Sequence, residues 1–584
     1  MAQKSLPLDD LTFREIREGN FIYADKTKYI YKLLEARRFK CCFLSRPRRF
    51  GKTLLLGTLE ELFQGDRELF RGLWIDKSGY KFERHPVLFF SMDYTGIKTD
   101  DDLILNIKDD LNSFAEDYEI TLTKTVYGQM FKQLLKGICK KHGTRVVILV
   151  DEYDAPVTDH ILDEELAKAN RTVLHDFYRS VKSNLRYIHF AFVTGITRFA
   201  MTALDSGPNN FKDISLKPKF AGICGFTERD VNKLFRGMFR KTIEILQKDG
   251  ELGPNAGPDE LMALIKKYYD GYNWLGEENI LNPFSILNFF EEKSLDMYWP
   301  ELGCPSHMKA LAKKNPLDFI HPSLDSYSVT DVRKTRLSNL QAVPLLFHSG
   351  YLTIDRPTVI ETIEEGIVIK EKAFIFRFPN QEVSQAYRKR FFDDIFEPKH
   401  GYLSNFTREL PNALAKKDSI TVARLLSDIL TSISFNEHPP EDDLVLSEQP
   451  DRGYEPTKTE RYYHAIFHTC FLAAGFEVHS QGSSAHGRND IALYLNNKVR
   501  VVIELKYCHA KEMTDDDGYV VKSGVEYKKA ELKAKEMSAA LDKAVNQMRD
   551  KDYAGPYRAA GCSVSCLAVA IRNRNQVAVR FFEY

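Results

Sequence analysis

Two acidic residues and a lysine in the last third of the chain have types and spacing that suit phosphate chemistry. Asp490 ends the segment Gly487-Arg488-Asn489-Asp490, and Glu504 and Lys506 lie two residues apart in a later apolar run. Two carboxylates on adjacent strands can hold Mg²⁺, which takes a few carboxylate oxygens together with water and substrate phosphate. A lysine beside them can position or deprotonate the water that attacks phosphorus. The alternative is a surface salt bridge between Glu504 and Lys506, because Glu-x-Lys is a common sequence.

The elements that position these three residues are two alternating runs around Asn496-Asn497. Residues 491–495 and 498–506 have the period of strands, and the two asparagines predict a hairpin with a two-residue turn. This pairing sets Asp490 opposite about Ile503, which is one residue before Glu504. Glu504 and Lys506 point to the same face because they are two apart on a strand. We therefore expect the three side chains to meet at one end of the hairpin.

A second group of residues, near the start of the chain, has the layout of a phosphate-binding loop. The apolar strand expected at residues 42–44 leads into a loop and then into Gly51-Lys52-Thr53, which opens the helix expected at residues 53–63. In such a loop, backbone N–H groups and the helix N-terminus face the phosphates, the lysine reaches the outer ones, and the hydroxyl holds Mg²⁺. The pattern G-x-x-x-x-G-K-[ST] departs at one position, because Arg46 stands where the first glycine is expected.

Two further strands are expected to complete this site. The apolar run from residue 146 ends in Asp151-Glu152, which is typical of a Walker B strand. There the aspartate supports the Mg²⁺ shell and the glutamate orients or activates the attacking water. The alternative is a buried strand that ends in two acids. A third strand, at residues 189–197, predicts Thr194 as a sensor of the γ-phosphate and Arg198 as an arginine that approaches the phosphates. For Arg198 the alternative is a surface position.

Length and composition bound the class of protein. A chain of 584 residues is too long for one core, and alternating strands and helices predict a parallel sheet with helices on both faces. The formal net charge is zero, so any nucleic acid contact must use local patches.

Nine cysteines without CxxC pairs favour reduced thiols. We find no signal pattern and no apolar run long enough to span a bilayer, so we expect a cytoplasmic protein with no membrane partner.

The motifs of the first half also resemble a known family. The segments RPRRFGKT, LVDEYDAPV, FVTGITR, YDGY (269–272) and NPFS (282–285) together look like the predicted AAA-like ATPases of bacteria and mobile elements, across about residues 5–300. The resemblance implies ATP and Mg²⁺ or Mn²⁺ as cofactors, and Arg46 is usual within that family. YDGY and NPFS are expected to be structural, with Gly271 in a turn and Asn282-Pro283 at a helix start. The expected nucleotide site comprises Arg46, Arg49, Gly51, Lys52, Thr53, Asp151, Thr194 and Arg198, with Glu152 as its catalytic residue.

The second half resembles a different family. Glu460 on an expected helix, GRxD, ELK, and residues 544–548 with Lys551 and Tyr553 follow the order of motifs in the PD-(D/E)XK nuclease superfamily, across about residues 415–584. The resemblance is to the domain found behind the AAA-like ATPase. It implies that Asp490 and Glu504 are metal ligands, that Lys506 is catalytic, and that Glu460 and Gln547 are supporting groups.

These expectations combine into one architecture and one activity. We expect an α/β fold, with a P-loop parallel sheet and a helical lid followed by a restriction-endonuclease-like α/β domain. The expected parts are an ATPase core (1–225), a lid (226–350), a connecting region (351–455) and a nuclease domain (456–584). The expected activity is nucleotide-gated, Mg²⁺-dependent hydrolysis of phosphodiester bonds by a chain that can form homo-oligomers, with DNA as the favoured substrate and RNA as the alternative. A role in defence or in a mobile element follows from family analogy alone. Two alternatives are a nucleotide-regulated binding or signalling protein with an inactive nuclease fold, and an ATPase whose C-terminal domain only mediates assembly.

Overall fold

Near-continuous apolar runs in the first 200 residues form the central strands of a parallel sheet. Its order is β2-β3-β4-β1-β5, and all neighbours are parallel. Runs of this kind suit strands that are buried on both faces. The predicted parallel sheet is confirmed, and β4 lies between the P-loop strand β1 and the Walker B strand β3. The strands are β1 (Cys41–Ser45), β2 (Val87–Ser91), β3 (Val146–Asp151), β4 (Ile188–Gly195) and β5 (Phe211–Asp213).

The structure is a computed structural model, and it does not describe every residue. It divides the chain into two compact units, Met1–Met308 with Ser323–Ser384, and Lys309–Pro322 with Gln385–Tyr584. The four-part division expected from the sequence stays a prediction. The described residues are 4–35, 39–161, 163–197, 211–299, 308, 327–329, 332, 342–364, 367–387, 402–432, 458–480, 483–484, 487–488, 491–495, 498–508, 519–522, 525–572 and 575–583.

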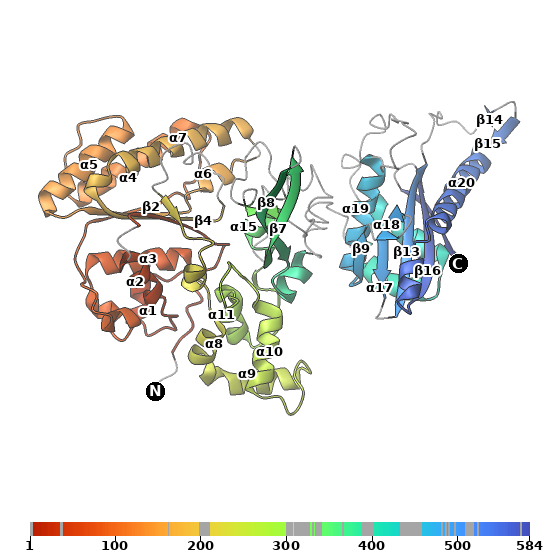
Figure 1. Cartoon of the computed structure of the whole chain (residues 1–584), viewed down its shortest axis with the longest axis horizontal. Helices are drawn as coiled ribbons and strands as arrows, with labels where there is room; N and C mark the ends of the chain where they lie inside the picture. Colours follow the sequence, from red (N-terminus) through yellow and green to blue (C-terminus); the bar gives the residue numbers. More distant parts are fainter. Residues whose placement is uncertain are drawn as a thin grey trace. The chain divides into compact units, whose positions relative to one another are not determined.

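Amphipathic helices cover both faces of the parallel sheet. In Figure 1, α4, α5 and α7 lie on one face and α1, α2 and α3 on the other. Leu103, Ile107 and Leu111 of α4 follow the i, i+4, i+8 spacing and join the buried core with Ile148 of β3. These helices are α1 (Phe13–Glu18), α2 (Thr27–Glu35), α3 (Lys52–Gln64), α4 (Asp100–Asp117), α5 (Tyr127–His142), α6 (Ala155–Thr158) and α7 (Glu164–Ser183), with 3₁₀ turns at η1 (Arg67–Phe70), η2 (Trp74–Lys77), η3 (Leu185–Tyr187) and η5 (Pro218–Ile223).

The helices expected for a lid follow the sheet and have their own aromatic core. Phe235 stacks on Phe290 with ring centroids 4.6 Å apart, and Phe239 packs on the same ring. The side chain of Asn282 caps the last helix of the group by accepting from two backbone N–H groups. The structural roles expected for YDGY and NPFS therefore agree with the fold. The helices are α8 (Glu228–Leu234), α9 (Arg236–Lys248), α10 (Pro258–Tyr269) and α11 (Pro283–Glu292).

Gly271 has a turn conformation that a side chain would not fit. Its φ is +102°, and a Cβ at this position would lie 2.0 Å from the carbonyl oxygen of Pro379. Only glycine combines this backbone angle with such a close approach.

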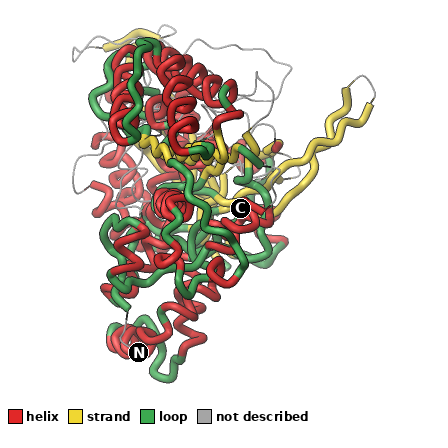
Figure 2. Tube along the Cα trace, turned by 90° about the vertical axis from the view of Figure 1, so that its left-hand side faces the viewer, coloured by secondary structure: helices red, strands yellow, loops and turns green. Residues whose placement is uncertain are grey.

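A small antiparallel sheet of order β6-β8-β7 completes the first unit. Residues 351–378 alternate in a strand-like way, and the sequence predicts a hairpin of segments 358–369 and 372–379. The structure has a hairpin of β7 (Thr353–Glu364) and β8 (Ile367–Arg377), so residues 367–369 belong to its second strand rather than to its first. The hairpin projects as a long ribbon in Figure 2. The buried helix α15 (Ala342–Ser349) precedes the hairpin, and the short strand β6 (Tyr327–Ser328) pairs with β8.

The second unit is built on a five-stranded mixed sheet of order β17-β16-β13-β12-β9. The central strands β13 and β16 are parallel over ten residue pairs. Val502, Ala544, Met548 and Ala568 belong to the core that α20 forms against these two strands. The elements are α17 (Tyr402–Ala415), α18 (Ser419–Ser432), α19 (Lys458–Ala473), β9 (Glu477–Ser480), β10 (Ser483–Ser484), β11 (Gly487–Arg488), β12 (Ile491–Tyr494), β13 (Val499–Cys508), β14 (Tyr519–Lys522), β15 (Val525–Lys528), α20 (Lys529–Asp550), α21 (Gly555–Ala559), β16 (Ser563–Arg572) and β17 (Gln576–Phe582).

Two details of the second unit differ from the sequence-based expectations. The sequence of residues 563–582 predicts a closing hairpin that covers the sheet, whereas in the structure this hairpin belongs to the sheet, with β16 between β13 and the edge strand β17. The β12–β13 hairpin is confirmed, but Ile491 rather than Asp490 lies opposite Ile503. The register moves by one because the N–H of Leu495 bonds to the carbonyl of Val499, which leaves three residues between the strands instead of two. Among the described residues, no helix is long and apolar enough to cross a membrane.

Candidate functional site

The P-loop connects β1 to α3 and opens at the N-terminus of that helix. Two residues of the loop have left-handed backbone, Arg49 with φ +64° and Gly51 with φ +83°. A Cβ placed on Gly51 would meet nothing within 4 Å, so this side of the loop is open. Alternation of left- and right-handed residues turns successive N–H groups toward a common centre and makes an anion-binding concavity. The backbone is therefore suited to a phosphate group.

Lys52 and Thr53 make internal contacts that a nucleotide would replace. The buried Lys52 donates from Nζ to the carbonyl oxygen of Pro47 at 3.1 Å. Burial lowers the pKa of Lys52, and the nearby Asp151 and Glu152 act in the opposite direction. Thr53 donates from Oγ1 to Oδ2 of Asp151 at 2.6 Å. The structure thus brings the Thr53 hydroxyl and the Asp151 carboxylate, the two groups expected to bind Mg²⁺, into direct contact.

The end of β3 joins this pair to the expected sensor on β4. Oδ1 of Asp151 accepts a hydrogen bond from the hydroxyl of Thr194 and another from the N–H of Glu152 at 3.0 Å. Glu152 is half-buried and has φ +46°, a strained value for a residue with a side chain. Burial raises the pKa of Glu152, while Lys52 lowers it. Thr53 in the first turn of α3, Asp151 at the end of β3 and Thr194 on β4 therefore form one connected group.

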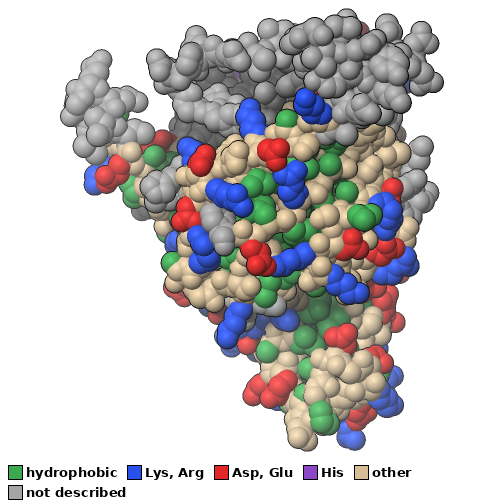
Figure 3. Space-filling model, turned by 90° about the vertical axis from the view of Figure 1, so that its right-hand side faces the viewer, with side chains coloured by type: hydrophobic (Ala, Val, Ile, Leu, Met, Phe, Trp, Pro, Cys, Tyr) green, Lys and Arg blue, Asp and Glu red, His purple; other side chains and the backbone are tan. Residues whose placement is uncertain are grey.

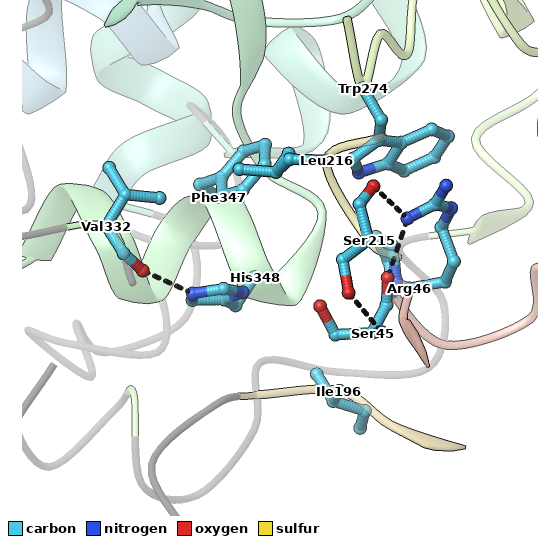
Figure 4. Close-up of a pocket in the computed structure, with 10 residues that line it drawn as sticks. Ser45, Arg46, Ile196, Ser215, Leu216, Trp274, Val332, Phe347 and His348 are labelled. Atoms are coloured by element: carbon cyan, nitrogen blue, oxygen red, sulfur yellow. Dashed lines mark hydrogen bonds between the residues drawn. The ribbon is translucent and has the colours of Figure 1, made fainter. Parts of the chain in front are cut away.

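Arg46 occupies the place of the missing glycine and turns its side chain into the protein. It is 1% exposed, and its guanidinium donates to the carbonyl oxygens of Ser45 at 2.8 Å and Ser215 at 2.9 Å (Figure 4). The carbonyls of Phe220 and Ala221 lie at 3.4 Å, and the guanidinium stacks on the indole of Trp274 at 4.1 Å. These contacts tie the P-loop to β1, to η5 and to the segment after YDGY. They support a structural role, and the expected nucleotide contact of Arg46 stays a prediction.

Two other arginines of the expected nucleotide site are less defined. Arg49 is exposed, its Nη1 lies 3.1 Å from Oδ1 of Asp10, and its guanidinium is over the ring of Phe284 at 5.2 Å. Its nucleotide contact stays a prediction. Arg198 lies outside the described residues.

Sequence reasoning missed Asp154, the third acid of LVDEYD. Its buried carboxylate accepts from the N–H of Ile196 at 3.2 Å and the N–H of Thr197 at 2.6 Å, and also from the Thr197 hydroxyl. Burial raises the pKa of Asp154, and these hydrogen bonds lower it. Gly195 permits the approach, since a Cβ there would lie 2.3 Å from Oδ1 of Asp154. The signal in the sequence was an acid three residues after the Walker B aspartate. The structure shows that this acid is buried and is not a surface charge.

The candidate nuclease centre lies on the central strand of the second unit. Glu504 is 1% exposed and Lys506 is 5% exposed, and Nζ of Lys506 donates to Oε1 of Glu504 at 2.9 Å. Glu504 and Lys506 are two residues apart from each other and from Val502 and Cys508, so all four side chains point to one face of β13. Val502 and Cys508 belong to the core that α20 forms, so this is the face that packs against α20. The alternative of a surface salt bridge is right about the ion pair but wrong about its exposure, because both side chains are buried.

The structure describes only part of the expected metal site. Asp490 lies outside the described residues, and the backbone of Glu460 is in α19 while its side chain is not described. Among the described residues, no group of three or more His, Cys, Asp or Glu side chains has an arrangement that could hold a metal ion. The roles of Asp490, Glu504 and Glu460 toward a metal stay predictions.

The helices beside β13 supply two further contacts. The side-chain amide of Gln547 on α20 donates to the hydroxyl of Tyr553 at 3.2 Å, so its described contact is within its own segment. Tyr463 of α19 stacks on Tyr507 with centroids 5.4 Å apart. Tyr507 points to the face of β13 opposite to Lys506, so α19 and α20 pack on different faces of the strand.

Comparisons with known proteins bear on both halves of the chain. Residues 9–205 match the family described as Predicted AAA-ATPase, and residues 458–581 match the PD-(D/E)XK nuclease superfamily. Solved structures of Drosophila ORC with Cdc6, bound to GC-rich and to AT-rich DNA, align with 48% of this chain and with 94% and 92% of theirs. Their identities are 12% and 14% and both TM-scores are 0.19, which is too weak a likeness to bear on function.

One curated relative matches along its whole length. It is described as an uncharacterized protein in the vnfD 5′ region of Azotobacter chroococcum mcd 1, and the two are 30% identical over 100% of this chain and 99% of the relative. The chain therefore belongs to the same family as this Azotobacter protein, and it combines a predicted AAA-ATPase domain with a PD-(D/E)XK nuclease superfamily domain.

Proposed function

We propose that this protein is a nucleotide-gated nuclease that hydrolyses phosphodiester bonds, with DNA as the favoured substrate and a divalent metal as cofactor. The observation that carries the proposal is the buried pair of Glu504 and Lys506 on the central strand of a nuclease-superfamily domain. A buried ion pair is a poor stabiliser, because removing two charges from water costs about as much as their attraction returns. A carboxylate and an ammonium placed together at this position are better explained by chemistry than by stability.

In this proposal each residue of the nuclease centre has one task. Glu504, together with Asp490, holds Mg²⁺ or Mn²⁺, which when bound supplies Lewis acidity and lowers the pKa of a coordinated water. The ammonium of Lys506 orients the attacking water and offsets the negative charge that develops on the phosphoryl oxygens. Its present hydrogen bond to Glu504 fixes the direction of the ammonium before substrate arrives.

The nucleotide site is proposed as the control end of the protein. With nucleotide bound, Lys52 would exchange the Pro47 carbonyl for the outer phosphates, Thr53 and Asp151 would hold Mg²⁺, and Glu152 would orient water. The donor set fits this cation, since a hydroxyl and a carboxylate already lie 2.6 Å apart at the helix N-terminus. Thr53 and Thr194 both donate hydrogen bonds to Asp151. A movement of Thr53 when phosphates bind would therefore change the hydrogen bond that Thr194 makes at the end of β4. Such a shared contact is a suitable element for gating.

The test is cleavage of plasmid, linear and single-stranded DNA and of RNA, with Mg²⁺ or Mn²⁺, with and without ATP. The variant Glu504→Gln keeps the shape of the side chain and removes the charge, so we expect cleavage to fall by at least 10²-fold. Lys506→Ala should do the same, and Lys543→Ala, an exposed lysine on α20, is the matched control that should cleave like the wild type. Thermal unfolding of each variant separates loss of chemistry from loss of fold.

Each rival class has its own outcome in this assay. Nucleic acid binding without cleavage at either metal indicates a binding or signalling protein with an inactive nuclease fold. Full cleavage by folded Glu504→Gln refutes the assigned centre. Cleavage that is indifferent to ATP and to Lys52→Ala removes the gating part of the proposal, with Lys28→Ala, an exposed lysine of α2, as its control.

A further inference from the structure

Arg572 lies beside the candidate nuclease centre, although no motif pointed to it. It is the last residue of β16, and it pairs with Cys508 in the parallel ladder, one step of two residues beyond the pair of Lys506 and Ala570. Residues that pair in a ladder share a face, so Arg572 is on the same face as Glu504 and Lys506. Figure 1 shows β13 and β16 side by side with α20 next to them. The carboxyl ends of both strands point toward the same edge of the sheet, and ligands of α/β sheets bind at such edges.

The side chain of Arg572 is buried but only partly bonded. It is 2% exposed, and its Nη2 lies 3.2 Å from Oε2 of Glu536 on α20. Within the described part of the chain, its Nε and Nη1 have no hydrogen-bond partner. A guanidinium is always charged and carries five N–H donors, so leaving two nitrogen atoms unsatisfied away from water is costly. Arg46 of the same chain is more fully bonded, since its Nη1 and Nη2 donate to four backbone carbonyls and only its Nε has no partner among the described residues.

A phosphodiester group is the ligand that these observations fit. The planar fork of arginine binds phosphate oxygens through two parallel N–H groups, and Nε with one Nη is the pair of donors that such binding uses. The formal net charge of the chain is zero, and on the face drawn in Figure 3 basic and acidic side chains are interspersed. On that face, nucleic acid would therefore be held by individual cations rather than by a broad basic field.

We propose that Arg572 is a phosphate-binding residue of the nuclease centre, and that it holds a backbone phosphate next to the one that is cleaved. Glu536 keeps the guanidinium in place in the absence of nucleic acid and yields it to the phosphate, because both present anionic oxygens to the same fork. The inference rests on the proposed nuclease function and deepens it, by assigning a backbone contact that the metal ligands and Lys506 do not provide.

The experiment measures binding rather than cleavage. The full chain is titrated into a labelled DNA duplex, and separately into an RNA duplex, in EDTA and over a range of salt concentrations. The slope of log K against log salt reports the number of phosphate contacts, at about 0.9 per contact for B-DNA. Arg572→Gln should reduce this slope by about 0.9 and weaken binding by about ten- to a hundredfold at low salt. Glu536→Gln, the matched control, breaks the same ion pair but keeps the cation, so it should bind as tightly as the wild type or more tightly.

A purely structural ion pair predicts a different pattern. In that case Arg572→Gln and Glu536→Gln weaken binding alike, through a lower melting temperature, and the salt slope stays at its wild-type value; either result overturns the inference. If Arg572→Gln does not fold, Arg572→Lys decides, because it keeps one charge and loses the fork. Weaker binding by Arg572→Lys at an unchanged slope and an unchanged melting temperature supports the assignment, whereas unchanged binding, or weaker binding that follows a lower melting temperature, overturns it. Failure of the wild type to bind either duplex would instead refute the proposed function itself.

Discussion

Restoring the expected glycine of the P-loop should damage this protein. The variant Arg46→Gly rebuilds the general pattern G-x-x-x-x-G-K-[ST] in a chain where the arginine is buried and bonded to the protein. Two of its hydrogen bonds are short, to the carbonyls of Ser45 and Ser215 at 2.8 and 2.9 Å. Burial lowers the pKa of Arg46 to about 10, so the guanidinium remains charged at neutral pH and its bonds are charge-assisted.

The expected loss of stability is the difference between the favourable contacts that the substitution removes and the desolvation cost that it also removes. Charge-assisted hydrogen bonds contribute about 1.5–3 kcal/mol each, and a desolvated cation–π contact such as the one with Trp274 about 2 kcal/mol. Deleting the side chain also removes the desolvation cost of a buried cation, several kcal/mol. We therefore expect a net loss of about 2–4 kcal/mol in the free energy of unfolding of the first unit. For a unit of this size that loss corresponds to a fall of roughly 3–5 °C in melting temperature.

The assay is calorimetric unfolding together with titration of a fluorescent ATP analogue. Arg49→Gly is the matched control, because Arg49 is exposed and has φ +64°, which glycine adopts without strain. It should leave the melting temperature unchanged or raise it slightly. Arg46→Lys keeps the charge but cannot reach the same carbonyls, so it should fall between the wild type and Arg46→Gly. If Arg46→Gly melts like the wild type and binds nucleotide more tightly, the assignment of Arg46 as a structural residue is refuted.

Three other substitutions test buried groups of the first unit. Burial raises the pKa of Glu382 to about 8 from an ordinary value of 4.5, so the folded state binds more protons between these limits and stability should fall by roughly 3 kcal/mol from pH 6 to pH 8. Glu382→Gln should flatten this decline in calorimetric melting temperatures, and an unchanged pH slope would contradict it. Gly195→Ala places a Cβ 2.3 Å from Oδ1 of Asp154, so we expect a loss of more than about 2 kcal/mol by urea unfolding, and a neutral effect would refute the contact. Asp154→Asn turns an amide donor toward the N–H of Thr197, and it should lower the melting temperature while a distant exposed change such as Lys28→Ala does not.

Local patterns in the sequence were sufficient for most of the first unit. The apolar runs before Lys52, through residue 150 and before Gly195 predicted β1, β3 and β4 to within about two residues, since a strand buried on both faces needs a continuous apolar run. The contacts among Thr53, Asp151 and Thr194 were predictable as well, because parallel strands bring their carboxyl ends to one edge of the sheet.

Two features of the second unit show where local pattern stops being sufficient. The turn after Leu495 contains three residues, and this one extra residue moved the register of β12 against β13. The parallel pairing of β16 with β13 joins segments about 60 residues apart, and no local signal distinguishes it from a hairpin that closes over the sheet.

The sequence by itself determined which residues are candidates for the chemistry, because lysine, hydroxyl and carboxylate groups at strand ends have recognisable spacing. Only the tertiary structure decided the contacts of Arg46 and Arg572, which are both buried. Arg46 bonds to carbonyls of residues 215, 220 and 221, and Arg572 pairs with Cys508 on the strand that carries Glu504 and Lys506. Backbone carbonyls belong to every residue type and leave no mark in a sequence, so a partner of this kind becomes visible only when distant segments are brought together.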